Sequence, residues 1–167
     1  MRLIKPYYVV ESILTPDQCG EMLQLIERAG RTCKKSEEKI TNISYYSFIE
    51  DLIARGHESV LEHEKITVRF ICDRGISHEL VRHRIASFSQ ESTRYCNYTK
   101  DKFEHDITFI IPCWLQIEEG YYNNKSLIND INTATWIYNC VACEEDYFRL
   151  INDLKWTPQQ ARSVLTN

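Results

Sequence analysis

The order in which helix and strand patterns follow one another constrains the fold of this chain more than any single motif does. Stretches rich in β-branched and aromatic residues predict strands at residues 5–14, 65–73 and 103–112. Apolar residues at helical spacing predict helices at residues 15–30, 40–56, 74–86 and 126–155, and a last helix from Thr157 onward. Strands and helices do not alternate one to one, as they do in a doubly wound parallel sheet. We therefore expect an α+β fold, with a mixed or antiparallel sheet packed with long helices.

Two of these helices begin with the same start signal. Thr15 and Thr157 each precede a proline at the first helical position, and a glutamine follows each threonine three residues later. A threonine that exchanges hydrogen bonds with such a glutamine forms a capping box, and proline favours the first helical turn. The second signal lies shortly before Asn167, so the chain is expected to be short at its C-terminal end.

Length and charge limit the kind of protein that this chain can be. At 167 residues it is expected to fold as one domain, residues 1–167, with an adequate core. Its net charge of −4 does not favour a nucleic acid or an anionic membrane as partner, so any anion site has to be local. No apolar run has the length of a membrane span, and the first residues do not form a targeting segment. We expect a cytoplasmic protein.

The seven cysteines are expected to be reduced thiols. Their number is odd, and a chain of this length can fold without cross-links. They are Cys19, Cys33, Cys72, Cys96, Cys113, Cys140 and Cys143.

The densest run of chemically active residues is "RHRIASFSQESTRY", residues 82–95. Its arginines, serines and threonine can bind an anion, but it contains no glycine, and the five glycines elsewhere cannot build a GxGxxG motif or a P-loop. A phosphate would therefore be held by side chains. Arg94 offers a planar fork suited to phosphate. On a regular helix Arg82 and Arg84 would point about 200° apart, toward two ligands or two chains.

Two other interpretations of this segment remain. The first is structural: a solvated helix end whose arginines pair with Glu79 and Glu91. The second is nucleophilic catalysis by Ser92, although no strand–elbow–helix pattern surrounds this serine.

A metal site is not expected. The histidine pairs of His57–His63 and His78–His83 are six and five residues apart, whereas a zinc-binding helix needs a spacing of four. Cys140 and Cys143 have the spacing of half a zinc ribbon, but no second cysteine pair accompanies them.

The order of residues in the arginine-rich segment resembles the signature of the flavin-dependent thymidylate synthases. That signature is Arg-His-Arg, seven residues and a serine, here residues 82–84 and Ser92, and the similarity continues through residues 94–95. Upstream, "GHESVLEHEKITVRF" (56–70) is similar to the family's Gly-His-Glu-x-x-x-Glu-His segment and the strand after it. Downstream, "QQARSVL" (159–165) resembles the family's Ala-Arg-x-x-Leu stretch. The three stretches occur in the family's order.

This resemblance implies an enzyme that converts dUMP to dTMP and takes the methylene carbon from methylenetetrahydrofolate. In this family reducing equivalents pass from NADPH through FAD. The resemblance also implies the family's α+β fold and a homotetramer with FAD and dUMP where subunits meet. A nucleophilic serine is not implied, because the protein would place the ligands and stabilise charge while the cofactor carries the hydride chemistry.

By position, the resemblance assigns two overlapping sets of binding residues. The residues expected to contact FAD are His57, Ser59, Arg82, His83, Arg84, Ile85 and Gln90. The residues expected to line the dUMP site are Glu79, Arg82, Gln90, Glu91, Ser92, Thr93, Arg94 and Arg162. Within the second set, Ser92 and Arg94 are expected to hold the phosphate.

The family's pattern continues past the stretches that this chain matches. The arginine credited with activating the uracil ring would follow Asn167, so no catalytic residue is assigned, and the 167-residue chain is expected to turn over poorly. A flavin- or nucleotide-binding module without catalysis is therefore a second hypothesis. A third is RNA or DNA binding through residues 82–94 with Tyr95 and Tyr98, which the negative net charge disfavours.

Overall fold

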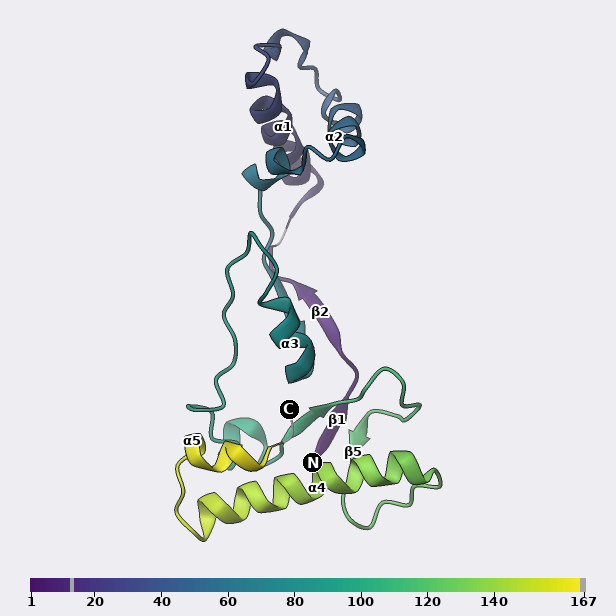
Figure 1. Cartoon of the computed structure of the whole chain (residues 1–167), viewed down its shortest axis with the longest axis vertical. Coiled ribbons are helices and arrows are strands. Elements are labelled where there is room, and N and C mark those ends of the chain that lie inside the picture. The colour runs from purple at the N-terminus through teal and green to yellow at the C-terminus, as the bar shows by residue number, and fades with distance from the viewer. Residues whose placement is uncertain (13, 166–167) are drawn as a thin grey trace. The chain divides into compact units, whose positions relative to one another are not determined.

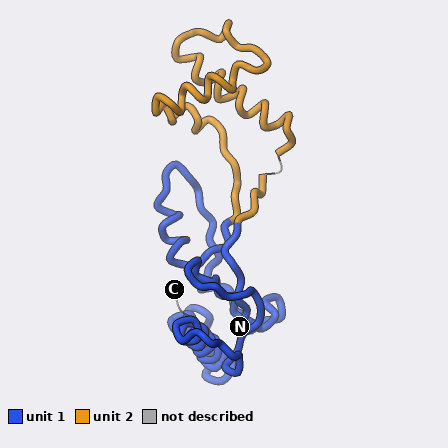
Figure 2. Tube along the Cα trace, turned by 90° about the vertical axis from the view of Figure 1, so that its right-hand side faces the viewer, with its two compact units in different colours: residues 1–7, 70–167 blue, residues 8–69 orange. Residues whose placement is uncertain are grey.

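The structure is a computed structural model that describes residues 1–12 and 14–165 (Figure 1). It confirms the α+β class, with helices and two small sheets. The chain divides into two compact units, one formed by residues 1–7 and 70–167 and the other by residues 8–69 (Figure 2). Within the described residues, no helix combines the length and the apolar character that a membrane crossing requires.

A three-stranded mixed sheet lies in the unit of residues 1–7 and 70–167. Its central strand is β1 (Arg2–Ile4), which pairs in parallel with β4 (Thr108–Ile110) and antiparallel with β5 (Gly120–Tyr121). Only β4 was predicted, inside residues 103–112. The other two strands have three and two residues, too few for an alternating pattern to stand out.

Helix α4 (Ile131–Asn152) packs its apolar stripe against this sheet and the segments next to it. The buried residues of this cluster are Met1, Leu3, Ile111, Ile137, Cys140 and Val141. The helix was predicted over residues 126–155. It begins only at Ile131 because the Asp130 carboxylate accepts the main-chain N–H of Thr133 at 2.7 Å and so caps the first turn.

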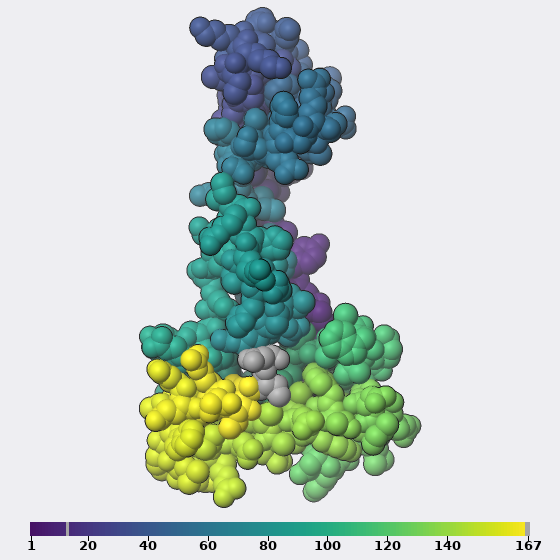
Figure 3. Space-filling view, in the orientation of Figure 1, coloured from purple at the N-terminus to yellow at the C-terminus, as the bar shows by residue number. Residues whose placement is uncertain are grey.

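The C-terminal helix α5 (Pro158–Ala161) lies against α4, as the yellow segment in the space-filling view shows (Figure 3). Its predicted capping box is confirmed: Thr157 and Gln160 exchange both hydrogen bonds. A short 3-10 helix, Arg162–Val164, follows it. Ala161 is buried with Ile107 and with Tyr147 of α4 in a second core cluster. The remainder of the predicted last helix lies outside the described residues.

One carboxylate is buried between α4 and the start of β4. Glu144 accepts the main-chain N–H of Ile107 at 2.7 Å, and its second oxygen lies 2.7 Å from the main-chain nitrogen of Met1. Both oxygens of this nearly inaccessible side chain therefore have polar partners, as a buried charge requires.

The unit of residues 8–69 is helical. Helix α1 (Pro16–Thr32) packs on α2 (Tyr45–Ala54), and two short 3-10 helices, Glu37–Lys39 and Glu58–His63, complete the unit. The predicted capping box of α1, formed by Thr15 and Gln18, is also confirmed.

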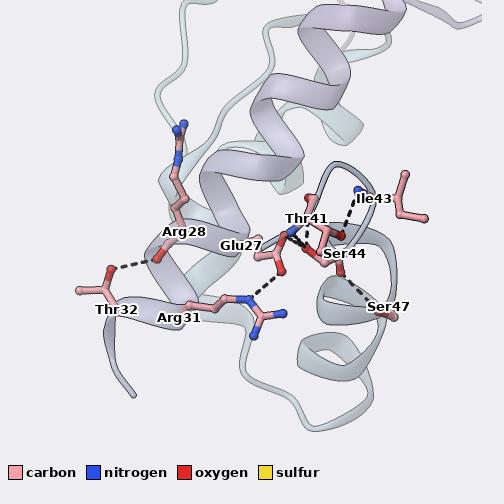
Figure 4. Close-up of polar contacts among 8 residues, drawn as sticks. All are labelled: Glu27, Arg28, Arg31, Thr32, Thr41, Ile43, Ser44 and Ser47. Carbon is pink, nitrogen blue, oxygen red and sulfur yellow. Dashed lines mark hydrogen bonds and ion pairs between the residues drawn. The ribbon is translucent and has the colours of Figure 1, made fainter. Parts of the chain in front are cut away.

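A buried carboxylate joins α1 to the start of α2 (Figure 4). Glu27 is completely inaccessible to solvent, and it accepts hydrogen bonds from Arg31 Nε at 2.7 Å and from Ser44 Oγ at 2.8 Å. The Arg31 guanidinium also lies 4.7 Å from the centre of the Phe48 ring. Sequence reasoning did not single out Glu27, because its burial depends on how the two helices pack.

The two-stranded sheet is formed by β2 (Tyr7–Val10) and β3 (Val68–Ile71), and the boundary between the units falls within these strands. In the strand predicted at residues 65–73, Ile66, Val68, Phe70 and Cys72 alternate with other residues, and this pattern predicts one buried face for β3. This burial pattern was wrong, because Phe70 is 52% exposed and Ile66 lies outside the strand. Two strands alone do not enclose a side chain as a larger packed sheet does.

Two glycines of α1 predict opposite effects of the same substitution. A Cβ at Gly30 would lie 2.7 Å from the Phe48 ring and 3.1 Å from Val60, too close for a rigid ring. Gly30→Ala is therefore expected to lower the free energy of unfolding by about 1 kcal/mol, because overpacking outweighs the gain in helix propensity. At Gly20 the nearest atom, the Tyr45 hydroxyl, would lie at 3.8 Å, so Gly20→Ala is expected to stabilise by about 0.5–1 kcal/mol. Urea denaturation followed by circular dichroism measures both. Equal effects of the two substitutions would contradict this packing.

Candidate functional site

The arginine-rich segment follows α3 (Arg74–Leu80), a short helix capped by the Asp73 carboxylate. The prediction of a helix through residue 86 was wrong. The main-chain N–H groups of Arg82 and His83 bond to carbonyls three residues earlier, each at 3.1 Å, so the last turn tightens and the helix ends. Arg82 and Arg84 therefore do not lie on a regular helix. The inference that they point toward two different ligands or chains loses its geometric support.

Residues 81–90 are all exposed. Arg82 is 74% exposed and forms an ion pair with Glu79 at 3.2 Å, while Ile85 is 80% exposed. Gln90 is held differently: its side-chain amide donates to the hydroxyl of Ser77 on α3 at 2.7 Å. The first half of the segment is thus accessible to a ligand. At its end, Gln90 is hydrogen-bonded to α3.

The second half of the segment forms a tight turn. The Ser92 carbonyl accepts the main-chain N–H groups of Tyr95 at 3.0 Å and of Cys96 at 2.9 Å. Ser92 and Thr93 are half-buried in this turn, whereas Arg94 and Tyr95 are exposed. The Arg94 guanidinium lies 5.5 Å from the centre of the Tyr95 ring. The turn therefore places hydroxyl groups and a guanidinium next to one another.

The C-terminal segment meets this turn. Arg162 donates from Nη1 to the Thr93 hydroxyl at 3.3 Å, across 69 positions of sequence. Arg94 donates from Nε to the side-chain oxygen of Gln159 on α5 at 3.4 Å. The structure thus brings together Thr93, Arg94 and Arg162, three residues of the predicted dUMP set. Gln159 was not predicted to belong to the site. Its position three residues before Arg162, in "QQAR", was the signal that could have indicated it.

Glu91 is hydrogen-bonded to Tyr98, a residue that was predicted to take part only in the nucleic-acid alternative. The Tyr98 hydroxyl donates to Glu91 Oε1 at 2.7 Å. Burial raises the pKa of the Tyr98 phenol well above its usual value, and the hydrogen bond to the Glu91 carboxylate raises it further. The phenol therefore stays protonated at neutral pH and acts as the donor.

The site is rich in guanidinium groups that are not committed to carboxylates. Among the described residues, Arg82 forms an ion pair, whereas Arg84, Arg94 and Arg162 form none. The structural interpretation held that the arginines of the segment pair with Glu79 and Glu91. Among the described residues, this is true only of the pair of Arg82 with Glu79. Cationic groups beside short hydroxyl donors are suited to phosphate esters.

His57 and Ser59, the remaining predicted FAD contacts, belong to the unit of residues 8–69. His57 directly precedes the 3-10 helix Glu58–His63, and both side chains are exposed. The His57 main-chain N–H bonds to the Leu52 carbonyl at 2.9 Å, which fixes the turn after α2. A surface pocket of about 350 Å³ in the same unit, lined by parts of α1, contains neither residue.

Six of the cysteines are free thiols, as predicted: Cys19, Cys33, Cys72, Cys96, Cys113 and Cys143.

Comparison with known proteins gives one consistent answer. The sequence model of the thymidylate synthase complementing protein family matches residues 17–167. A relative in Mycobacterium avium is 32% identical over 152 residues, which cover 86% of this chain and 57% of the relative. Relatives in Pyrococcus furiosus and Geobacter sulfurreducens are 38% and 40% identical over 89 and 82 residues, covering 53% and 45% of this chain.

All three relatives bear the name flavin-dependent thymidylate synthase. The matches cover 36% and 35% of the Pyrococcus furiosus and Geobacter sulfurreducens proteins, so this chain aligns with between 35% and 57% of the length of the three relatives. No solved structure gives a significant match. Because the family model covers nearly the whole chain, this chain belongs to the thymidylate synthase complementing protein family, the family of the flavin-dependent thymidylate synthases.

Proposed function

We propose that this chain is part of an enzyme that converts dUMP to dTMP, in dTMP biosynthesis. The shared name of its relatives supports this reaction and a flavin cofactor. In this proposal the carbon comes from methylenetetrahydrofolate, and NADPH supplies reducing equivalents through FAD. The enzyme is a cytoplasmic homotetramer with active sites where subunits meet.

The observation that carries the proposal is the contact between the turn of residues 92–96 and the C-terminal segment. Arg162 reaches Thr93 at 3.3 Å, and the neighbouring Arg94 forms no ion pair among the described residues. Two guanidinium groups beside the Ser92 and Thr93 hydroxyls form a donor set suited to the phosphate of dUMP. The signature that the arginine-rich segment resembles and the long-range contact thus both support a nucleotide site at this turn.

The exposed residues after α3 fit FAD by the chemistry of their donors. Arg82 and Arg84 can bind an anionic pyrophosphate, and the exposed Ile85 can cover an apolar surface. The full set that would hold FAD is His57, Ser59, Arg82, His83, Arg84, Ile85 and Gln90. Bound FAD, once reduced by NADPH, would supply the hydride that completes the methyl group.

The chain's own residues would contribute placement and electrostatics. Ser92 and Arg94 would fix the phosphate of dUMP and so orient the nucleotide. The arginines around the turn would stabilise negative charge that develops on the pyrimidine. Glu79, Gln90 and Glu91 would complete the lining of the dUMP site.

Retention of FAD after desalting tests this proposal. The chain loaded with FAD is expected to keep a visible flavin absorbance band, and Arg84→Ala is expected to raise the FAD dissociation constant about tenfold through loss of a charge-assisted contact. Arg55→Ala is the matched control, because this exposed arginine pairs with Asp51 in the other unit. Loss of FAD from the wild type, or equal binding by Arg84→Ala and the wild type, would count against these flavin contacts.

A further inference from the structure

The turn of residues 92–96 is attached to the protein core at both of its ends. Before the turn, the Glu91 carboxylate accepts the Tyr98 hydroxyl at 2.7 Å. At its end, the Cys96 carbonyl accepts the hydroxyl of Tyr147 at 3.4 Å. Tyr147 belongs to α4 and is completely inaccessible to solvent, so it is a fixed point. These two bonds act together with the main-chain bonds to the Ser92 carbonyl and the contacts of Thr93 and Arg94 with the C-terminal segment.

Tyr98 is itself fixed by aromatic packing. Its ring lies 5.0 Å from the ring of Phe103, in an edge-on arrangement, and 5.7 Å from the ring of Tyr147. It also packs against the core cluster of Ile107, Tyr147 and Ala161. A ring held on these sides can orient its hydroxyl group at low cost in conformational entropy, because few rotamers remain to be lost.

We propose that Tyr98 is a positioning residue which, through Glu91, holds the turn of residues 92–96 in the conformation that presents Ser92 and Arg94 to the phosphate of dUMP. This inference rests on the proposed function. It gives Glu91 a different task from lining the nucleotide: one of its oxygens serves as the acceptor that connects the turn to the aromatic cluster. The negative charge of Glu91 is then less important than its ability to accept a hydrogen bond.

The test measures the dissociation constant of dUMP for the FAD-loaded chain by equilibrium dialysis. Tyr98→Phe keeps the ring and removes the hydroxyl, so it is expected to raise this constant about three- to tenfold, the effect of one lost hydrogen bond. The affinity for deoxyuridine, which lacks the phosphate, is expected to stay unchanged. A fall in the folded fraction alone would lower the number of binding sites and leave the dissociation constant unaltered.

Substitutions of Glu91 separate the two roles of this residue. Glu91→Gln keeps an oxygen acceptor and is expected to bind dUMP within about twofold of the wild type, whereas Glu91→Ala is expected to match the loss in Tyr98→Phe. Combining Tyr98→Phe with Glu91→Ala should add no further loss, because both remove the same bond. Tyr138→Phe, which removes a hydroxyl bonded to the Ser126 carbonyl at 3.1 Å, is the matched control and should change nothing.

Two outcomes would overturn the inference. If the wild type binds dUMP and Tyr98→Phe binds it equally well, Tyr98 does not position the turn, and the proposed function stands without it. If Glu91→Gln loses as much affinity as Glu91→Ala, the charge of Glu91 acts directly on the ligand. A wild type that binds FAD but no dUMP would remove both the inference and the dUMP part of the proposed function.

Discussion

Replacement of Arg94 by alanine is expected to raise the dissociation constant of dUMP by about 10- to 100-fold. A hydrogen bond to a charged group contributes about 1.5–3 kcal/mol, and a guanidinium fork can make two such bonds to one phosphate. Arg94 is exposed, and its guanidinium hydrogen-bonds within the described chain only through Nε, to Gln159. Its two terminal nitrogens therefore remain for the nucleotide. Equilibrium dialysis with FAD-loaded protein measures the effect.

Two further variants make this experiment specific. Arg94→Lys keeps the positive charge but loses the planar fork, so it should recover only part of the affinity. Arg55→Ala removes another exposed arginine, which lies in the other unit, and should leave dUMP binding unchanged. Arg94→Ala with wild-type affinity would remove Arg94 from the phosphate site.

Replacement of Glu27 by alanine is expected to lower the free energy of unfolding by about 3 kcal/mol, because it breaks a buried ion pair and leaves one charge behind. Glu27 is completely buried, and its partner Arg31 is 12% exposed. The substitution also deprives the Ser44 hydroxyl of its acceptor between α1 and α2. Urea denaturation followed by circular dichroism measures the loss.

The exposed pair of Arg55 with Asp51 provides the control. It has the same spacing along a helix as the pair of Arg31 with Glu27, but its side chains are about half exposed, so Asp51→Ala should change stability very little. Glu27→Gln keeps the shape and an acceptor oxygen, and its loss should fall between those of the two alanine variants. If Asp51→Ala and Glu27→Ala lower the free energy of unfolding equally, burial does not make the pair of Glu27 with Arg31 more important for stability than the exposed pair.

Local signals predicted the starts of α1 and α5 well. The capping boxes of Thr15 and Thr157 are both present, because each depends only on residues within one turn. The α+β class and the family were also predicted correctly. Strands β1 and β5 were missed because β1 is a strand through its pairing with β4 and β5, and β5 through its pairing with β1, rather than through their own sequences.

The candidate site shows the same limit. The arginine-rich segment was found from the order of its residues, but the contacts that shape it are made by distant side chains. Arg162 reaches Thr93 across 69 positions, and Tyr98 reaches Glu91 from a buried aromatic cluster. The end of α3 at Leu80 was missed because apolar spacing continued beyond it while the hydrogen bonds tightened. The assignment of individual residues to FAD and dUMP stays a prediction.

The measurement that tests the central claim most directly is the visible spectrum of the FAD-loaded chain during a titration with dUMP. If residues 82–95 hold both ligands, dUMP will shift the flavin band with saturable dependence on concentration, and Arg94→Ala will move the midpoint to higher dUMP. A flavin band that is retained but does not respond to dUMP, in the wild type and in Arg94→Ala alike, would contradict a shared site and favour a flavin-binding module without catalysis.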